Sequence, residues 1–147
     1  MRYLRIPPQT LLHNLMAIGY GGVLMIWLST ENASIWLTVV LGLGLALMIV
    51  TLGVLHWMGG RTINLARGWL VLLGIITGTL SPITTFFLML FKNVQHSHIV
   101  PDFSNEVMSE ILVRTPAWAL AGGLIGGAVM LMGLAVPENK NATKPAD

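Results

Sequence analysis

Two histidines and an aspartate between the third and fourth apolar segments form the cluster with the clearest chemical potential. His96 and His98 are separated by one residue, and Asp102 follows shortly after them. In an extended segment alternate residues point the same way, so both imidazoles lie on one face, as a metal chelate requires. We favour a simpler interpretation, in which these residues form a polar collar that ends the third segment at the membrane surface. Metal binding or proton sensing by the histidines is the competing hypothesis.

His13 and His56 form a second histidine pair, at the start of the first apolar segment and the end of the second. Two imidazoles on adjacent helices can bind haem iron from opposite sides. Because both positions fall at the predicted membrane boundary, where histidine is common, they are weak haem candidates. We therefore expect no cofactor.

Hydroxyl side chains cluster around a proline inside the third apolar segment. Thr77, Ser81, Thr84 and Thr85 flank Pro82. They could line a polar path for an ion or a small solute. We favour a structural role within the helix. Hydroxyls next to an intramembrane proline can donate to carbonyl groups that lack their usual N–H partner.

The composition explains why these polar residues stand out. Hydrophobic residues make up 54% of the 147 residues and charged residues 10%, with a mean hydropathy of +0.75. Soluble domains carry roughly 25% charged residues, so the bilayer is the expected environment. The absence of cysteine excludes disulfides, thiolate catalysis and cysteine-ligated metals. The net charge of +2 is better explained by membrane topology than by nucleic-acid binding.

Four uncharged apolar segments are long enough to cross a bilayer as helices, which needs about 20 residues each. Thr10 is the expected N-cap of the first. The sequence therefore predicts an all-α membrane protein with four transmembrane helices in one domain, residues 1–136, followed by a disordered cytoplasmic tail, 137–147. The predicted spans are residues 11–28, 34–57, 68–91 and 116–136.

A shorter helix is predicted over residues 102–113, with Asp102 as its N-cap. Phe103, Val107 and Ile111 share one face, and polar residues occupy the other. Because this segment is too short to cross the membrane, we expect an amphipathic helix on its surface, with the apolar face in a lipid or partner interface.

The basic residues predict the orientation. Flanking Lys and Arg are concentrated on the cytoplasmic side of membrane proteins. Both termini and the second connection fall on one side of the predicted layout, which places both termini in the cytoplasm. The residues on that side are Arg2, Arg5, Arg61, Arg67, Lys140 and Lys144, against Lys92 and Arg114 on the other.

Glycines spaced four residues apart mark the helix-packing surfaces. Such pairs let two membrane helices approach closely. We favour packing within the chain, although the last span carries two such pairs and could also contact an external partner. The glycines are Gly74 and Gly78 in the third span, and Gly122, Gly123, Gly126 and Gly127 in the fourth.

The sequence thus predicts a non-enzymatic accessory subunit or assembly factor of a larger membrane complex. Its partners would be lipid and other membrane subunits, or further copies of the chain. The alternative is a small channel or transporter that uses the polar third span. A metal-dependent membrane protein using His96 and His98 is the third hypothesis.

Overall fold

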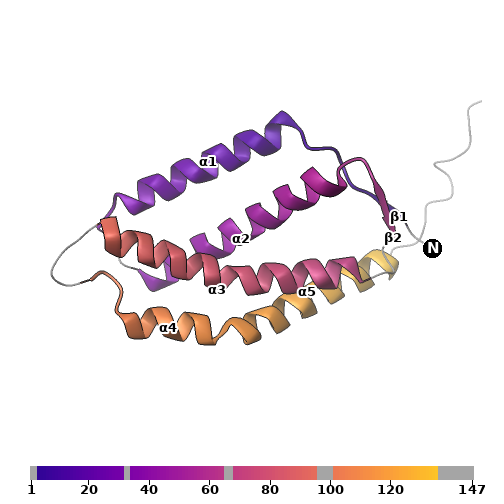
Figure 1. Ribbon diagram of the computed structural model, residues 1–147. Helices are drawn as coiled ribbons and strands as arrows, with labels where there is room; N and C mark the ends of the chain where they lie inside the picture. The colour runs from indigo at the N-terminus through magenta and orange to yellow at the C-terminus, as the bar shows by residue number, and fades with distance from the viewer. Residues whose placement is uncertain (1–2, 32–33, 65–67, 96–100, 136–147) are drawn as a thin grey trace, which may run out of the picture.

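The computed structural model describes residues 3–31, 34–64, 68–95 and 101–135, and within them the chain is an all-α membrane bundle, as predicted (Figure 1). Four helices are long and apolar enough to cross a membrane. In chain order the elements are β1 (Tyr3–Arg5), α1 (Leu11–Leu28), α2 (Ile35–Met58), β2 (Thr62–Asn64), α3 (Trp69–Gln95), α4 (Asn105–Val113) and α5 (Thr115–Ala135).

Helix α3 is the centre of the bundle, since α1, α2, α4 and α5 all contact it. Its contact with α2 uses a hydroxyl, because Oγ1 of Thr84 donates to the carbonyl of Gly42 at 2.7 Å. Gly42 is buried against Thr85, where an added Cβ would collide with the threonine backbone and side chain. Gly42 therefore sets how closely α2 approaches α3.

Glycines bring α3 and α5 into backbone contact. A Cβ added at Gly74 would collide with the carbonyl of Gly122, and one added at Gly122 would collide with the carbonyl of Gly74. Gly78 likewise faces the Trp118 carbonyl, and Gly126 the Leu70 carbonyl. Only glycine permits this separation, because the opposing atoms are backbone and cannot rotate away.

The second glycine pair of α5 also faces α3. Cβ atoms added at Gly123 and Gly127 would meet the side chains of Ile75 and Val71, respectively. Both glycine pairs of α5 thus face α3. Neither pair is left for the external partner that the sequence suggested for this helix.

Helix α4 lies beside the second half of α3, while α5 lies beside the first half (Figure 1). Phe103 and Met108 pack against the buried Met89 of α3. Asn93 fixes the start of this segment, because its amide donates to the Phe103 carbonyl at 2.8 Å and accepts from the Phe103 N–H at 2.9 Å.

The apolar face of α4 is therefore turned inward. Phe103 is only 3% exposed, and Val107 and Ile111 pack around the same cluster, where the sequence suggested a lipid or partner interface. The N-cap is Ser104, whose Oγ accepts from the Val107 N–H at 3.3 Å, and not Asp102 as predicted.

Lys92 is the clearest departure from the sequence prediction. The third span was expected to end at residue 91, with Lys92 in the polar connection, but α3 continues to Gln95 and buries Lys92 completely. Its Nζ donates to the Trp27 carbonyl at 3.3 Å, and Asp102 attracts it electrostatically. The lysine is tolerated inside because neighbouring segments supply these partners.

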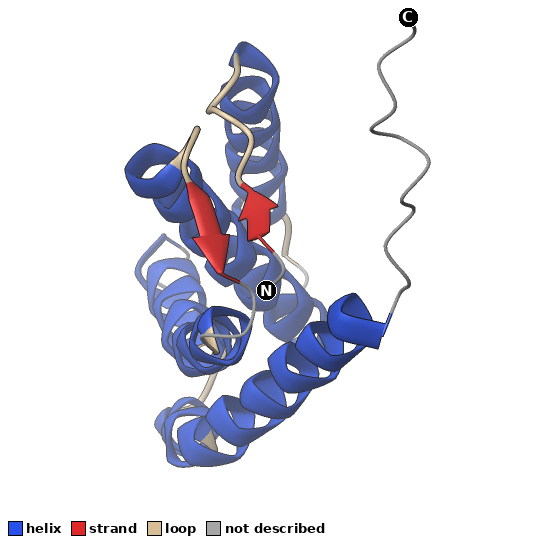
Figure 2. Ribbon diagram, turned by 90° about the vertical axis from the view of Figure 1, so that its right-hand side faces the viewer, coloured by secondary structure: helices blue, strands red, loops and turns tan. Residues whose placement is uncertain are grey.

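Two short strands join the start of the chain to the connection between α2 and α3. They pair antiparallel, with Leu4 opposite Ile63, and were not predicted. Figure 2 shows the pair lying across one end of the bundle. The pairing puts β1 and the second connection at the same end, as an even number of intervening spans requires.

Candidate ligand-binding cavity

A cavity of about 460 Å³ lies between α2, α3, α4 and the start of α5. Most of its surface is apolar, with a few polar side chains, which is the usual character of a small-molecule site. The residues that give it chemical character are Trp36 on α2, Ser81 and Pro82 on α3, Glu110 on α4, Arg114 between α4 and α5, and Trp118 on α5.

Ser81 supplies the buried polar group of this cavity. It is 1% exposed, and its hydroxyl has no hydrogen-bond partner among the residues that the structure describes. A buried hydroxyl without a partner costs free energy, so such groups are unusual in folded proteins. Ser81 is therefore the residue of the predicted polar stretch that lines the cavity and has a hydroxyl without a partner in the described structure.

The neighbouring threonines are engaged elsewhere. Thr77 donates to the Leu73 carbonyl at 2.8 Å, and Thr85 donates to the Ser81 carbonyl at 2.8 Å. Thr84 bonds α2, as described above. Of the residues suggested for a polar path, Ser81, Pro82 and Thr85 line the cavity, while Thr77 and Thr84 do not.

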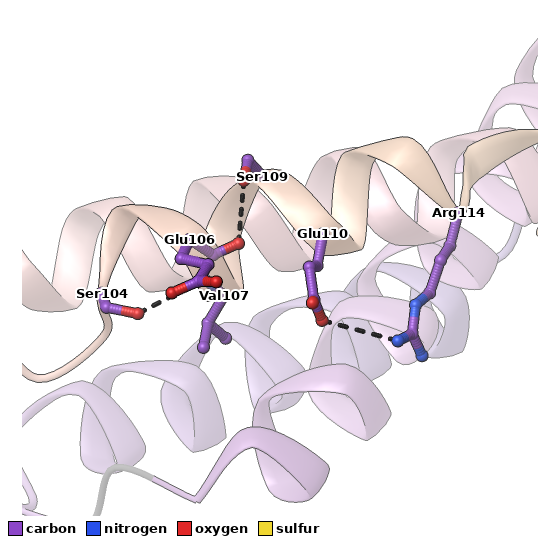
Figure 3. A network of polar contacts seen from close by, with 6 residues as sticks. All are labelled: Ser104, Glu106, Val107, Ser109, Glu110 and Arg114. Carbon is purple, nitrogen blue, oxygen red and sulfur yellow. Dashed lines mark hydrogen bonds and ion pairs between the residues drawn. The ribbon is translucent and has the colours of Figure 1, made fainter.

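Glu110 and Arg114 form an ion pair at the cavity, with 3.5 Å between Oε2 and Nη2. In Figure 3 Glu110, on α4, and Arg114, just after it, extend from the same side of the chain toward the neighbouring helices, whereas Ser109 points away. The pair is exposed and long, so it adds little to stability. Sequence reasoning did not assign it a role, although the i,i+4 spacing of an acid and an arginine was a readable signal.

The two haem candidates have different surroundings. His13 caps α1, since its Nδ1 accepts from the Thr10 N–H at 3.2 Å and lies 2.7 Å from Thr10 Oγ1. It also lines a groove of about 210 Å³ against α2. His56 is exposed on the last turn of α2 and is not among the residues that line this groove. The structure thus gives His13 a role as a helix cap.

The metal hypothesis falls largely outside the described residues, which do not include His96 and His98. Of its three members only Asp102 is described, and it is half-buried near Lys92. Elsewhere in the described ranges no group of three or more acidic or histidine side chains could hold a metal. Metal binding at this segment stays a prediction.

The fold and composition define a small multi-pass membrane protein. Comparison with protein-family models, with curated proteins and with solved structures gave no match. The function of this protein is therefore inferred from its own geometry.

Proposed function

We propose that this protein is a non-enzymatic accessory subunit or assembly factor of a larger membrane complex. The observation that carries the proposal is the sparse packing of helix α1, which is long enough to span the membrane but makes few contacts with the rest of its own chain. All of α1 is described, and Trp27 is its single buried residue. A helix this poorly packed within its own chain offers most of its surface to another protein.

One side of α1 is held by Tyr20, whose hydroxyl donates to the carbonyl of Leu41 on α2. Gly19 and Gly22 are three residues apart and share another face of the helix. A Cβ added to either would meet nothing within 4 Å. Exposed small residues are the surfaces by which membrane helices associate. A helix of the partner packed over Gly19 and Gly22 would use this surface.

Gentle extraction tests the proposal. We expect the protein in native membranes to migrate on a native gel with a larger assembly, and replacement Gly22→Leu to release it as a small species. The matched control is Gly53→Leu, because Gly53 on α2 also has nothing within 4 Å of an added Cβ. This control should leave the assembly intact.

Two results would contradict the proposal. The first is a lone species of 15.9 kDa under every gentle extraction condition. The second is equal retention of the assembly by both variants, which would place the partner away from α1.

The orientation belongs to the same proposal. The excess of basic residues at the end of the bundle that holds β1 and β2 supports a cytoplasmic position for both termini. A reporter enzyme that works only in the cytoplasm, fused after Asp147, should be active. A label that cannot cross the membrane should reach a cysteine at Ser97 from outside, and protection of that cysteine would contradict the layout.

The channel hypothesis has less support. The hydroxyl hydrogens of Thr84 and Thr85 already bond carbonyls, so neither group can donate a hydrogen bond to a permeating solute without giving up that contact. Vesicles that contain the purified protein are therefore expected to be no leakier to small ions than empty vesicles. A flux that disappears in a Thr84→Val/Thr85→Val variant would favour the channel instead.

A further inference from the structure

We propose that the cavity between α2, α3, α4 and α5 binds an amphiphile with a singly charged anionic head, held by Arg114 and Ser81. Its apolar chain would lie along α2 and α4. The site is distinct from the α1 surface to which the accessory role was assigned. Either proposal can therefore fail alone.

The position of the cavity along α3 is the first argument. Ser81 and Pro82 stand at the middle of this 27-residue helix. A helix of that length extends about 40 Å, against about 30 Å for the hydrocarbon core. The middle of α3 is thus inside the membrane, whereas Arg114 directly precedes the spanning helix α5 and so lies near a membrane boundary. The cavity joins these two levels.

The exposure of the charged pair is the second argument. Glu110 and Arg114 line the cavity together with Ser81, and their side chains are 61% and 69% exposed in the chain alone. Charges are costly inside a bilayer but are tolerated at its boundary, where they can reach water. At that level both side chains are open to the polar head of a membrane amphiphile.

The chemistry of Arg114 indicates an anion. A guanidinium carries five N–H donors in a fixed plane that matches carboxylate and phosphate oxygens. Glu110 occupies one Nη at 3.5 Å, which is a long contact, and other donors remain for a ligand.

Two further groups restrict the ligand. Ser81 presents a buried hydroxyl without a partner, which an anionic oxygen would satisfy. Glu110 would repel a head with more than one negative charge. A carboxylate or a phosphodiester therefore fits better than a phosphomonoester.

The remaining wall of the cavity fits an apolar chain. Ile35, Val39 and Ile111 line it, and Trp36 stands at the start of α2 with 76% of its surface exposed. Tryptophan prefers the boundary between lipid and water. A chain that extends from the head along these residues would leave the cavity toward the bilayer.

Binding is tested on the purified full-length protein in a non-ionic detergent. The thermal midpoint of unfolding is measured against added phosphatidylglycerol, a long-chain fatty acid and phosphatidylcholine. We expect at least one of the two anionic lipids to raise the midpoint saturably, since a ligand that binds the folded state stabilises it. Phosphatidylglycerol alone would identify a phosphodiester ligand, and the fatty acid alone a carboxylate.

Two variants locate the site. Arg114→Gln should weaken the effect of the anionic lipid roughly tenfold or more, and Ser81→Ala by a smaller factor. Arg61→Gln is the control, because Arg61 is an exposed arginine at the other end of the bundle. Equal stabilisation by phosphatidylcholine, or equal losses in Arg114→Gln and Arg61→Gln, would overturn the proposal.

A second measurement does not depend on the folding of the Arg114 variant. The anionic lipid that raises the midpoint, brominated in its acyl chain, quenches nearby tryptophan. At low mole fraction we expect saturable quenching that is clearly weaker in Trp36→Phe, the remainder coming from Trp118 on the same cavity. Trp57→Phe is a matched control, because Trp57 is 79% exposed but lies at the opposite end of α2. An equal decrease of quenching in Trp36→Phe and Trp57→Phe, or no saturable quenching in the unsubstituted protein, would show that the acyl chain does not bind in the cavity.

Discussion

The ammonium group of Lys92 lies 4.2 Å from the centroid of the Trp27 ring and donates a hydrogen bond to the carbonyl of the same residue. One residue of α1 thus supplies both a π face and a backbone acceptor to a lysine of α3. This contact joins the most loosely packed helix of the bundle to its central one.

The two residues should therefore be energetically coupled. Trp27→Leu leaves a buried ammonium without its ring, whereas Lys92→Met replaces the lysine with an apolar chain of similar length. A desolvated cation–π contact contributes about 2 kcal/mol to the free energy of unfolding. We expect a coupling of about 1–2 kcal/mol in a double-mutant cycle measured by unfolding in denaturing detergent.

The control for this cycle is Trp36→Leu, whose ring is 76% exposed. It should show no coupling to Lys92→Met. A coupling near zero for Trp27 as well would mean that the ring does not stabilise the buried ammonium.

The glycine contact between α3 and α5 predicts a large effect from a very small change. In Gly122→Ala the new methyl group would collide with the Gly74 carbonyl, so the helices must separate. We expect a loss of about 1–3 kcal/mol in the free energy of unfolding, the usual cost of overpacking. Gly53→Ala should be neutral or stabilising, since its Cβ meets nothing within 4 Å and alanine favours helix. Equal effects at both positions would contradict the observed helix contact.

The hydroxyl of Thr84 should contribute more to the free energy of unfolding than that of Thr79. The Thr84 hydroxyl donates to the Gly42 carbonyl on α2 at 2.7 Å and is also 2.9 Å from the Leu80 and Ser81 carbonyls of α3. Thr79 bonds the Ile75 carbonyl within its own helix. Hydrogen bonds between membrane helices contribute about 0.6 kcal/mol on average and up to about 1.7 kcal/mol. Thr84→Val should therefore lower the midpoint of unfolding, and Thr79→Val should leave it nearly unchanged. A larger loss from Thr79→Val would count against this packing of α2 on α3.

The pairing of β1 with β2 can be tested by cross-linking, because the chain has no native cysteine. Arg5 lies opposite Thr62 in the antiparallel register. Opposed Cα atoms in such a pair are about 4.5–5.5 Å apart, within the range that a disulfide can bridge. We expect Arg5→Cys/Thr62→Cys to form an internal disulfide under mild oxidation.

The control for the cross-link is Arg5→Cys/Thr30→Cys, since Thr30 follows α1 at the other end of the bundle. It should remain reduced as a monomer. Failure of the Arg5/Thr62 pair to cross-link would show that the two strands do not meet.

The four spanning helices could be predicted because each depends on a local property, the length of an uncharged apolar run. Thr10 could be recognised as the cap of α1 for a similar reason, since capping depends on neighbouring residues. The strands could not, because three residues are too few to show a period of two.

Lys92 and the cavity were not predictable from local sequence. A lysine that follows an apolar run is typical of a membrane boundary, and its burial depends on Trp27, 65 positions away. The cavity is likewise assembled from residues that are distant in the chain, such as Trp36, Ser81 and Arg114. The amphipathic pattern of α4 predicted a helix with one apolar face. It did not show that this face would pack against Met89 of α3 and not against lipid, because a local pattern does not identify the partner surface.

The pairing of β1 with β2 also bears on how the chain is built. It encloses α1 and α2 in a loop of residues 3–64 whose two ends are tied together. During synthesis that tie can form only after the second helix has been inserted and the following turn has emerged from the ribosome. The strand pair can thus hold the ends of the first two helices together before α3, against which α2 packs, is in place.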